Sequence, residues 1–170
     1  MIIFIPKGIE TICLCYVWYR EQRTDNKRKR WERFLLKILV IDAHGGGVGK
    51  ALVAGIKQNI PEAYVVAVGT NSIATSAMMK AGADKCATGE NAAVVCSRNA
   101  DVITGPIGII IADALLGEIT PRMALAISRA DAKRVLVPMK NCGNIVAGVG
   151  NMNMAELIAD AVCEIKKLVY

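Results

Sequence analysis

The stretch K-I-L-V-I-D-A-H-G-G-G-V-G-K, residues 37–50, decides the fold of this chain. Residues 38–41 are an uninterrupted apolar run, typical of a strand buried on both faces of a parallel sheet. Asp42 ends the run, a group of glycines follows, and residues 48–56 have the periodicity of a helix. A strand, a glycine turn and a helix direct backbone N–H groups and a positive helix end at an anion, usually a phosphate.

Two phosphate-binding motifs fit these glycines in part. Gly45-x-Gly47-x-x-Lys50 is the dinucleotide fingerprint with lysine in place of the third glycine. The same loop resembles the variant P-loop K-G-G-V-G-K-T of partitioning-type ATPases, but Gly45 replaces the lysine and Ala51 replaces the hydroxyl that holds Mg²⁺. ATP hydrolysis is therefore not expected. A turn that only lets the helix and the strand pack closely is the alternative.

Composition indicates one tightly packed α/β domain in a reducing compartment. Apolar residues make up 54% of the 170 residues, and aromatic residues only 5%. The six cysteines form no C-x-x-C pair and there is one histidine, so we expect reduced thiols in a cytoplasm and no metal site. Residues 1–35 hold eight of the 21 basic and four of the 15 acidic residues, which leaves residues 36–170 at +2. This charge predicts no nucleic-acid partner.

Residues 1–35 differ from the rest of the chain. Their apolar part is interrupted by Pro6, Lys7 and Glu10, so it is too short to span a membrane. Trp31-Glu32 requires the purine-rich codons TGGGA shortly before Leu36, whose codons TTG and CTG serve as bacterial starts. We therefore expect residues 1–35 to be a basic and apolar extension outside the fold, with a possible mis-assigned start, and residues 36–170 to be the domain.

From Leu36 onward, strand and helix patterns alternate. Apolar runs predict strands at residues 64–68, 85–87, 101–104 and 134–138, with a last edge strand at 145–149. Helices are expected at 73–80, 88–98, 121–129 and 154–168, the last two begun by a Thr-Pro pair and by a capping box. Residues 107–116 are apolar nearly all round, which predicts a buried helix or a subunit contact, with Asp113 facing solvent. The alternation predicts a single doubly wound, mainly parallel sheet of five or six strands with helices on both faces.

Small polar residues and glycines follow the predicted strands, and the carboxyl ends of parallel strands share one edge where ligands bind. No acid follows the second strand, where a NAD-binding unit usually places one for the ribose hydroxyls. This absence counts against NAD in its ordinary pose. The residues expected to hold a ligand are Asp42, Gly45, Gly46, Gly47, Val48, Gly49, Lys50, Gly69, Thr70, Asn71, Ser72, Thr88, Gly89, Glu90, Asn91, Gly105, Pro106, Ile107 and Gly108.

The chain from Leu36 resembles a family of small Rossmann-like proteins of unknown function from anaerobic Firmicutes. The resemblance rests on I-L-V-I-D-A-H-G-G-G-V-G-K-A-L, A-V-G-T-N-S-I-A-T-S-A-M-M-K-A-G-A-D, A-T-G-E-N-A, G-P-I-G-I-I-I-A-D, G-E-I-T-P and P-M-K-N-C. It covers about four-fifths of the sequence, and His44 stands where the family has Gln or Asn. The resemblance implies a fold and no reaction.

Individual side chains leave the chemistry open. Asp42 could hold a ribose or a metal, or it could cap its own turn. Lys50 could reach a phosphate or be solvated. Cys142, after the fifth strand, and His44 are the candidate catalytic residues, but a thiolate needs a base and no sequence argument brings the two together. Cys86, Cys96 and Cys163 are expected in the core.

These observations predict a protein that binds a nucleotide, NAD(P) or a mononucleotide, or another small phosphorylated molecule at residues 45–50. One alternative is a non-catalytic metabolite sensor that acts through its oligomeric state. The other is an NAD(P)-dependent oxidoreductase that works as a homo-oligomer, because 135 residues leave no room for a substrate domain. No membrane partner is expected, and whether a reaction is catalysed stays open.

Overall fold

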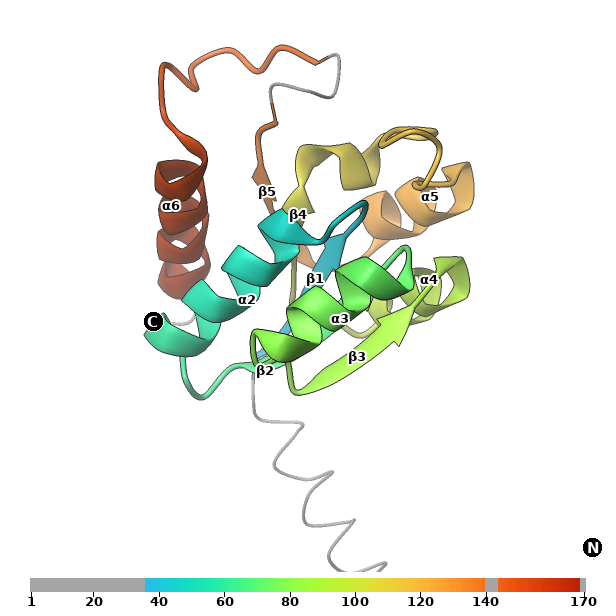
Figure 1. Cartoon of the computed structure of the whole chain (residues 1–170), viewed down its shortest axis with the longest axis horizontal. Helices are drawn as coiled ribbons and strands as arrows, with labels where there is room; N and C mark the ends of the chain where they lie inside the picture. The colour runs from blue at the N-terminus through green and yellow to red at the C-terminus, as the bar shows by residue number, and fades with distance from the viewer. Residues whose placement is uncertain (1–35, 140–143, 169–170) are drawn as a thin grey trace, which may run out of the picture. The chain divides into compact units, whose positions relative to one another are not determined.

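A computed structural model of the chain describes residues 36–139 and 144–168 (Figure 1). Five strands form one parallel sheet in the order β3-β2-β1-β4-β5. The strands are β1 (Lys37–Asp42), β2 (Tyr64–Gly69), β3 (Lys85–Thr88), β4 (Val102–Pro106) and β5 (Lys133–Val137). The helices are α2 (Gly47–Asn59), α3 (Ser72–Lys80), α4 (Glu90–Ser97), the 3₁₀ helix η1 (Ile107–Ile110), α5 (Pro121–Arg129) and α6 (Met154–Lys167). The predicted extension, residues 1–35, lies outside the described residues.

The apolar run in β1 becomes the centre of the sheet. All four residues at 38–41 are fully buried, because β2 and β4 pair with the two edges of β1 and helices cover both of its faces. In the register with β2, Asp42 lies beside Gly69. The loops that follow β1 and β2 therefore start side by side.

Side chains that alternate along β1 enter two separate cores. Ile38 and Val40 pack with residues of α2, α3 and α6 on one face of the sheet. Leu39 and Ile41 pack with residues of α4, η1 and α5 on the other face. Figure 1 shows α2 and α3 in front of the sheet and α4 and α5 behind it. The predicted doubly wound α/β fold is confirmed.

The strand order reverses at β1. The chain runs outward from β1 to β3 and then crosses back to β4, on the other side of β1. The loops that leave β1 and β4 therefore turn to opposite faces, and the carboxyl ends of these two strands form the switch point where ligands bind in such sheets. The two strands approach closely at Gly105, where a Cβ would lie 2.2 Å from the carbonyl oxygen of Ile41.

Two predicted elements are wrong. Residues 145–149 form no strand, and Ile145 is fully exposed. Residues 107–116 are not a helix throughout: η1 ends at Ile110, and Asp113, Leu115 and Leu116 have positive φ angles that no α-helix allows. The segment is hydrophobic because it contributes to the core: Ile109 is fully buried behind the sheet. Asp113 is exposed, as predicted.

The capping residues predicted for the last two helices are confirmed. The Thr120 side chain caps α5 ahead of Pro121, and the Asn153 and Glu156 capping box is present at α6. Cys163, expected in the core, is exposed on α6 instead. Among the helices of residues 36–139 and 144–168, none combines the length and the hydrophobicity needed to span a bilayer.

Candidate functional site

The first loop at the carboxyl edge is organised by the Asp42 side chain. This carboxylate is 4% exposed, and both of its oxygens accept backbone N–H groups, at 2.8 Å from Ala43 and 2.6 Å from Gly49 in the first turn of α2. Burial raises its pKa, although the two hydrogen bonds act in the opposite direction. Asp42 therefore caps α2 from beneath, which is one of its two predicted roles; a contact with a ligand stays a prediction.

The glycines of this loop fall into two pairs. At Gly46 a Cβ would lie 2.6 Å from the Ala74 backbone, and at Gly49 it would lie 2.6 Å from the Met78 sulfur, so packing requires both glycines. At Gly45 and Gly47 a Cβ would meet nothing within 4 Å, and neither residue has a positive φ. Neither packing nor backbone conformation explains the second pair.

The outward side of the loop has free donors. The backbone N–H groups of Gly45, Gly47 and Val48 have no hydrogen-bond partner in the described parts of the chain, and α2 has no acidic residue in its first turn. Gly45 and Gly47 are exposed. Helix N–H groups of this kind are donors for an anion.

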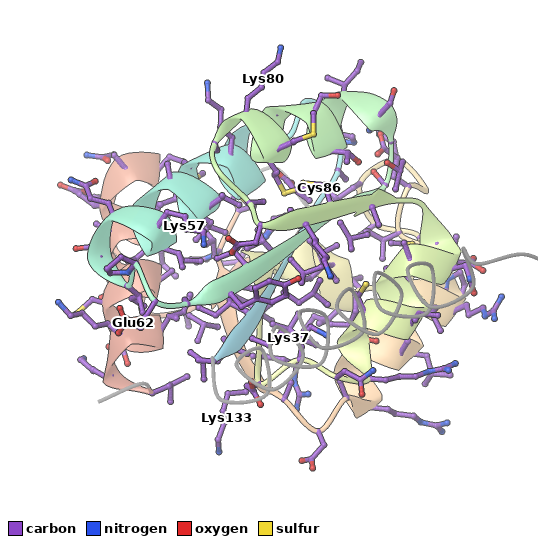
Figure 2. All side chains as sticks on the ribbon, turned by 90° about the horizontal axis from the view of Figure 1, so that it is seen from below. Lys37, Lys57, Glu62, Lys80, Cys86 and Lys133 are labelled. Atoms are coloured by element: carbon purple, nitrogen blue, oxygen red, sulfur yellow. The ribbon has the colours of Figure 1, made fainter. Side chains whose placement is uncertain are left out.

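A basic groove of about 450 Å³ lies between α2 and α3. Gly47 lines a separate groove, between α2 and α6. Lys50 and Lys80 line it, and within the described residues neither lysine has an ion-pair partner. Figure 2 shows Lys80 on the outer side of α3, directed away from the sheet. Two cations without a carboxylate in the lining favour an anionic ligand. The remaining lining residues are Ser72, Ile73, Ser76 and Ala77.

A second carboxylate, Glu118, joins three loops at the same edge. Its Oε2 accepts hydrogen bonds from the Thr70 hydroxyl, from Asn71 Nδ2 at 2.9 Å and from the His44 backbone N–H at 3.1 Å. Partial burial by itself would raise the pKa of Glu118, but these hydrogen bonds outweigh burial and hold that pKa below its ordinary value. Its other oxygen, Oε1, accepts no hydrogen bond within the described residues and lies 3.9 Å from the His44 ring.

Glu118 belongs to a tightly turned loop, residues 111–120. Asp113, Leu115 and Leu116 have φ angles of +61°, +55° and +57°, a conformation that costs free energy in residues with a side chain. The Leu115 carbonyl lies 3.0 Å from His44 Nε2, so the ring donates to it and holds the loop against β1. These contacts fix the Glu118 carboxylate over the ends of β1 and β2.

His44 and Asn71 complete the connection. The Asn71 amide donates to the His44 carbonyl at 3.0 Å, and its oxygen accepts the Ala74 N–H at 2.9 Å as the cap of α3. The His44 ring is exposed and held by Leu115. The other candidate catalytic residue from the sequence, Cys142, lies outside the described residues.

Thr88 reaches the Glu118 network only indirectly. It shares a hydrogen bond with Thr75 at 2.7 Å, and the Thr75 hydroxyl donates to the Asn71 carbonyl at 2.9 Å. Glu90 pairs instead with Arg122 of α5 at 3.1 Å. Gly105, Pro106 and Gly108 are buried, and Gly105 lies against Ile41 of β1. Contact with a ligand stays a prediction for the following residues: Gly69, Ser72, Thr88, Gly89, Glu90, Asn91, Gly105, Pro106, Ile107 and Gly108. Within the described residues, no group of His, Cys, Asp and Glu side chains is placed to hold a metal ion.

Sequence reasoning did not select Glu118 as a site residue. It lies 48 positions after Thr70 and just beyond residues 107–116, whose apolar character predicts a helix or a contact. The available signal was the block G-E-I-T-P, in which an acid precedes the helix N-cap, Thr120, by two residues at the carboxyl edge. That signal places Glu118 at the edge but does not choose its partners.

The chain belongs to the family described as a domain of unknown function, DUF3842, whose model matches residues 37–170. The match confirms an uncharacterised family; a source among anaerobic Firmicutes stays a prediction. A comparison with curated proteins found no match. Among solved structures, the chain is similar to a dodecameric FMN-dependent UbiX-like decarboxylase from Escherichia coli O157:H7. The identity is 16% and the TM-score 0.40, over 78% of this chain and 76% of that one. A likeness of this size implies nothing about ligand or reaction.

Proposed function

We propose that this protein binds a nucleotide or a similar small phosphorylated molecule, with a phosphate on the loop at residues 45–50. The observation that carries the proposal is the pair Gly45 and Gly47. Both have open space where a Cβ would lie and ordinary φ angles, so the fold alone does not require glycine there. Close approach of a ligand to the backbone does require it.

The donors and charges around the loop support a phosphate as that ligand. Gly45, Gly47 and Val48 offer N–H groups without a partner in the described residues, and Asp42 already satisfies the Gly49 N–H from the buried side. The negative charge of Asp42 opposes an anion at this helix end. Lys50, within the loop itself, and Lys80, across the groove between α2 and α3, supply the positive charge that offsets it.

We rank binding of a phosphorylated ligand above a sensor role that works through subunit assembly. A sensor that works through its oligomeric state needs a subunit contact, and residues 107–116 were the predicted one. Ile109 in that segment is buried within its own chain, whereas Leu116 is 94% exposed. A single exposed leucine is a small apolar area. An oxidoreductase would use the same phosphate site, so that alternative is tested together with the proposal.

Isothermal titration of the full chain with NAD(H), NADP(H), ATP, nucleoside monophosphates and flavins tests the proposal. We expect binding by at least one of them. Gly47→Leu should abolish it by filling the approach to the N–H groups, and Lys50→Ala should weaken it about tenfold or more by removing a charge-assisted hydrogen bond.

Lys133→Ala is the matched control for Lys50→Ala. Lys133 is exposed and begins β5, so it lies at the opposite, amino edge of the sheet (Figure 2). Its loss should leave the affinity unchanged. If a folded sample binds none of these compounds, or if Lys133→Ala weakens binding as much as Lys50→Ala, the proposed site is wrong.

A further inference from the structure

The carboxyl end of β2 has an acid beside it after all, supplied by a distant part of the chain. Dinucleotide-binding units place an acid after the second strand, where it accepts hydrogen bonds from the ribose hydroxyls. In this sequence Thr70 and Asn71 occupy that place. Both donate to Glu118, which brings a carboxylate to the residues that follow β2.

Only one oxygen of the Glu118 carboxylate accepts hydrogen bonds from the described residues. The three donors from Thr70, Asn71 and His44 all converge on Oε2. Oε1 accepts no hydrogen bond in the described residues, and the side chain is 30% exposed. The lowered pKa of Glu118 keeps the group ionised at neutral pH, so Oε1 is an acceptor without a donor among these residues.

Two roles are open to such a group, and their costs differ. A phosphate could displace Glu118 and take its three donors, but that requires breaking three hydrogen bonds to a charged oxygen. A ligand hydroxyl that donates to Oε1 breaks none of them. The arrangement resembles a positioned carboxylate, held through one oxygen by neighbouring groups and presenting the other.

We propose that Glu118 Oε1 accepts hydrogen bonds from vicinal hydroxyls of the bound ligand, which makes the ligand a ribonucleotide. The inference rests on the proposed phosphate site and names the substrate class of that same site. The phosphate lies at residues 45–50, and His44 links that loop to Glu118. Thr70, Asn71 and the His44 ring are positioning residues that fix the carboxylate.

The test compares paired ligands on the full chain by isothermal titration: AMP, GMP and ATP, each with its 2′,3′-dideoxy counterpart. For wild-type protein we expect at least tenfold tighter binding of the ribose form, because the dideoxy form leaves a partly buried carboxylate without its donors. In Glu118→Gln the amide oxygen can still accept from the three donors, but an NH₂ group replaces the acceptor Oε1. The ribose preference should fall to about one, while dideoxy binding stays unchanged.

The outcomes separate the two proposals. Equal binding of both forms by wild-type protein overturns the diol inference and leaves the phosphate site standing. An equal loss for both ligand forms in Glu118→Gln means that Glu118 only supports the loops, which also overturns it. If none of these paired nucleotides binds, the diol inference fails; if NAD(H), NADP(H) and the flavins do not bind either, the phosphate site fails with it. Should Glu118→Gln not fold, as judged by its thermal unfolding, the wild-type ratio alone decides.

Discussion

The loop after β1 and the loop at residues 111–120 each place one carboxylate at the carboxyl edge, and the two are used differently. Asp42 is buried, and both of its oxygens accept N–H groups of its own loop and helix. Glu118 is partly exposed, and one of its oxygens ties three loops together while the other accepts no hydrogen bond in the described residues. The number of oxygens already satisfied separates a carboxylate that serves the fold from one available to a ligand.

The largest expected effect is the loss of stability on removing the Asp42 carboxylate. Asp42→Ala leaves the buried N–H groups of Ala43 and Gly49 without acceptors and should lower the free energy of unfolding by about 3 kcal/mol. Glu118→Ala should cost only about 1 kcal/mol, since its donors can turn to water. Urea unfolding followed by circular dichroism measures both. A larger loss for Glu118→Ala would reverse the assigned roles.

The two glycine pairs give the second prediction. Gly49→Ala places a methyl group 2.7 Å from the Asp42 Cβ and 2.6 Å from the Met78 sulfur, which should destabilise the protein by about 1–3 kcal/mol. Gly47→Ala, in the same helical turn, should change stability by less than about 0.5 kcal/mol. Thermal and urea unfolding of the two variants provide the comparison. Equal losses would mean that the fold requires both glycines, which would remove the argument for a ligand.

The smallest effect concerns pH. The pKa of Glu118 is lowered on folding, so its contribution to stability is present above the unfolded value of about 4.3 and is lost as the pH falls through the folded value. Asp42 has the opposite sign: its raised pKa favours folding in the protonated form, and this contribution is lost as the pH rises through the folded value.

Urea unfolding between pH 3 and pH 7 checks these signs. The stability difference between wild-type protein and Glu118→Gln should shrink as the pH falls through the lowered pKa of Glu118, because the protonated carboxyl is uncharged like the amide. Lys133→Ala, which removes a charge at the amino edge, should show no such trend. A difference that grows on acidification would show that the Glu118 carboxylate is not held by its three donors.

Local patterns predicted most of the fold. The apolar run at residues 38–41 identified the central strand because a strand buried on both faces has no polar position. Each of these four side chains does enter one of the two cores. The caps of α5 and α6 were predictable because they depend on residues three positions apart. The helix predicted at residues 107–116 was wrong because hydrophobicity alone does not distinguish a buried helix from a turn that buries one isoleucine.

The sequence by itself determined the alternation of strands and helices, the glycine turn and the two helix caps, all of which arise from interactions between near neighbours. Only the tertiary structure decided that Gly45 and Gly47 face open space, that Asp42 uses both oxygens within its own loop and helix, and that Glu118 reaches Thr70 across 48 residues. These facts depend on the strand order, which brings β1, β2 and the loop at 111–120 to one edge. Strand order is set by long-range packing, and no short segment of the sequence encodes it.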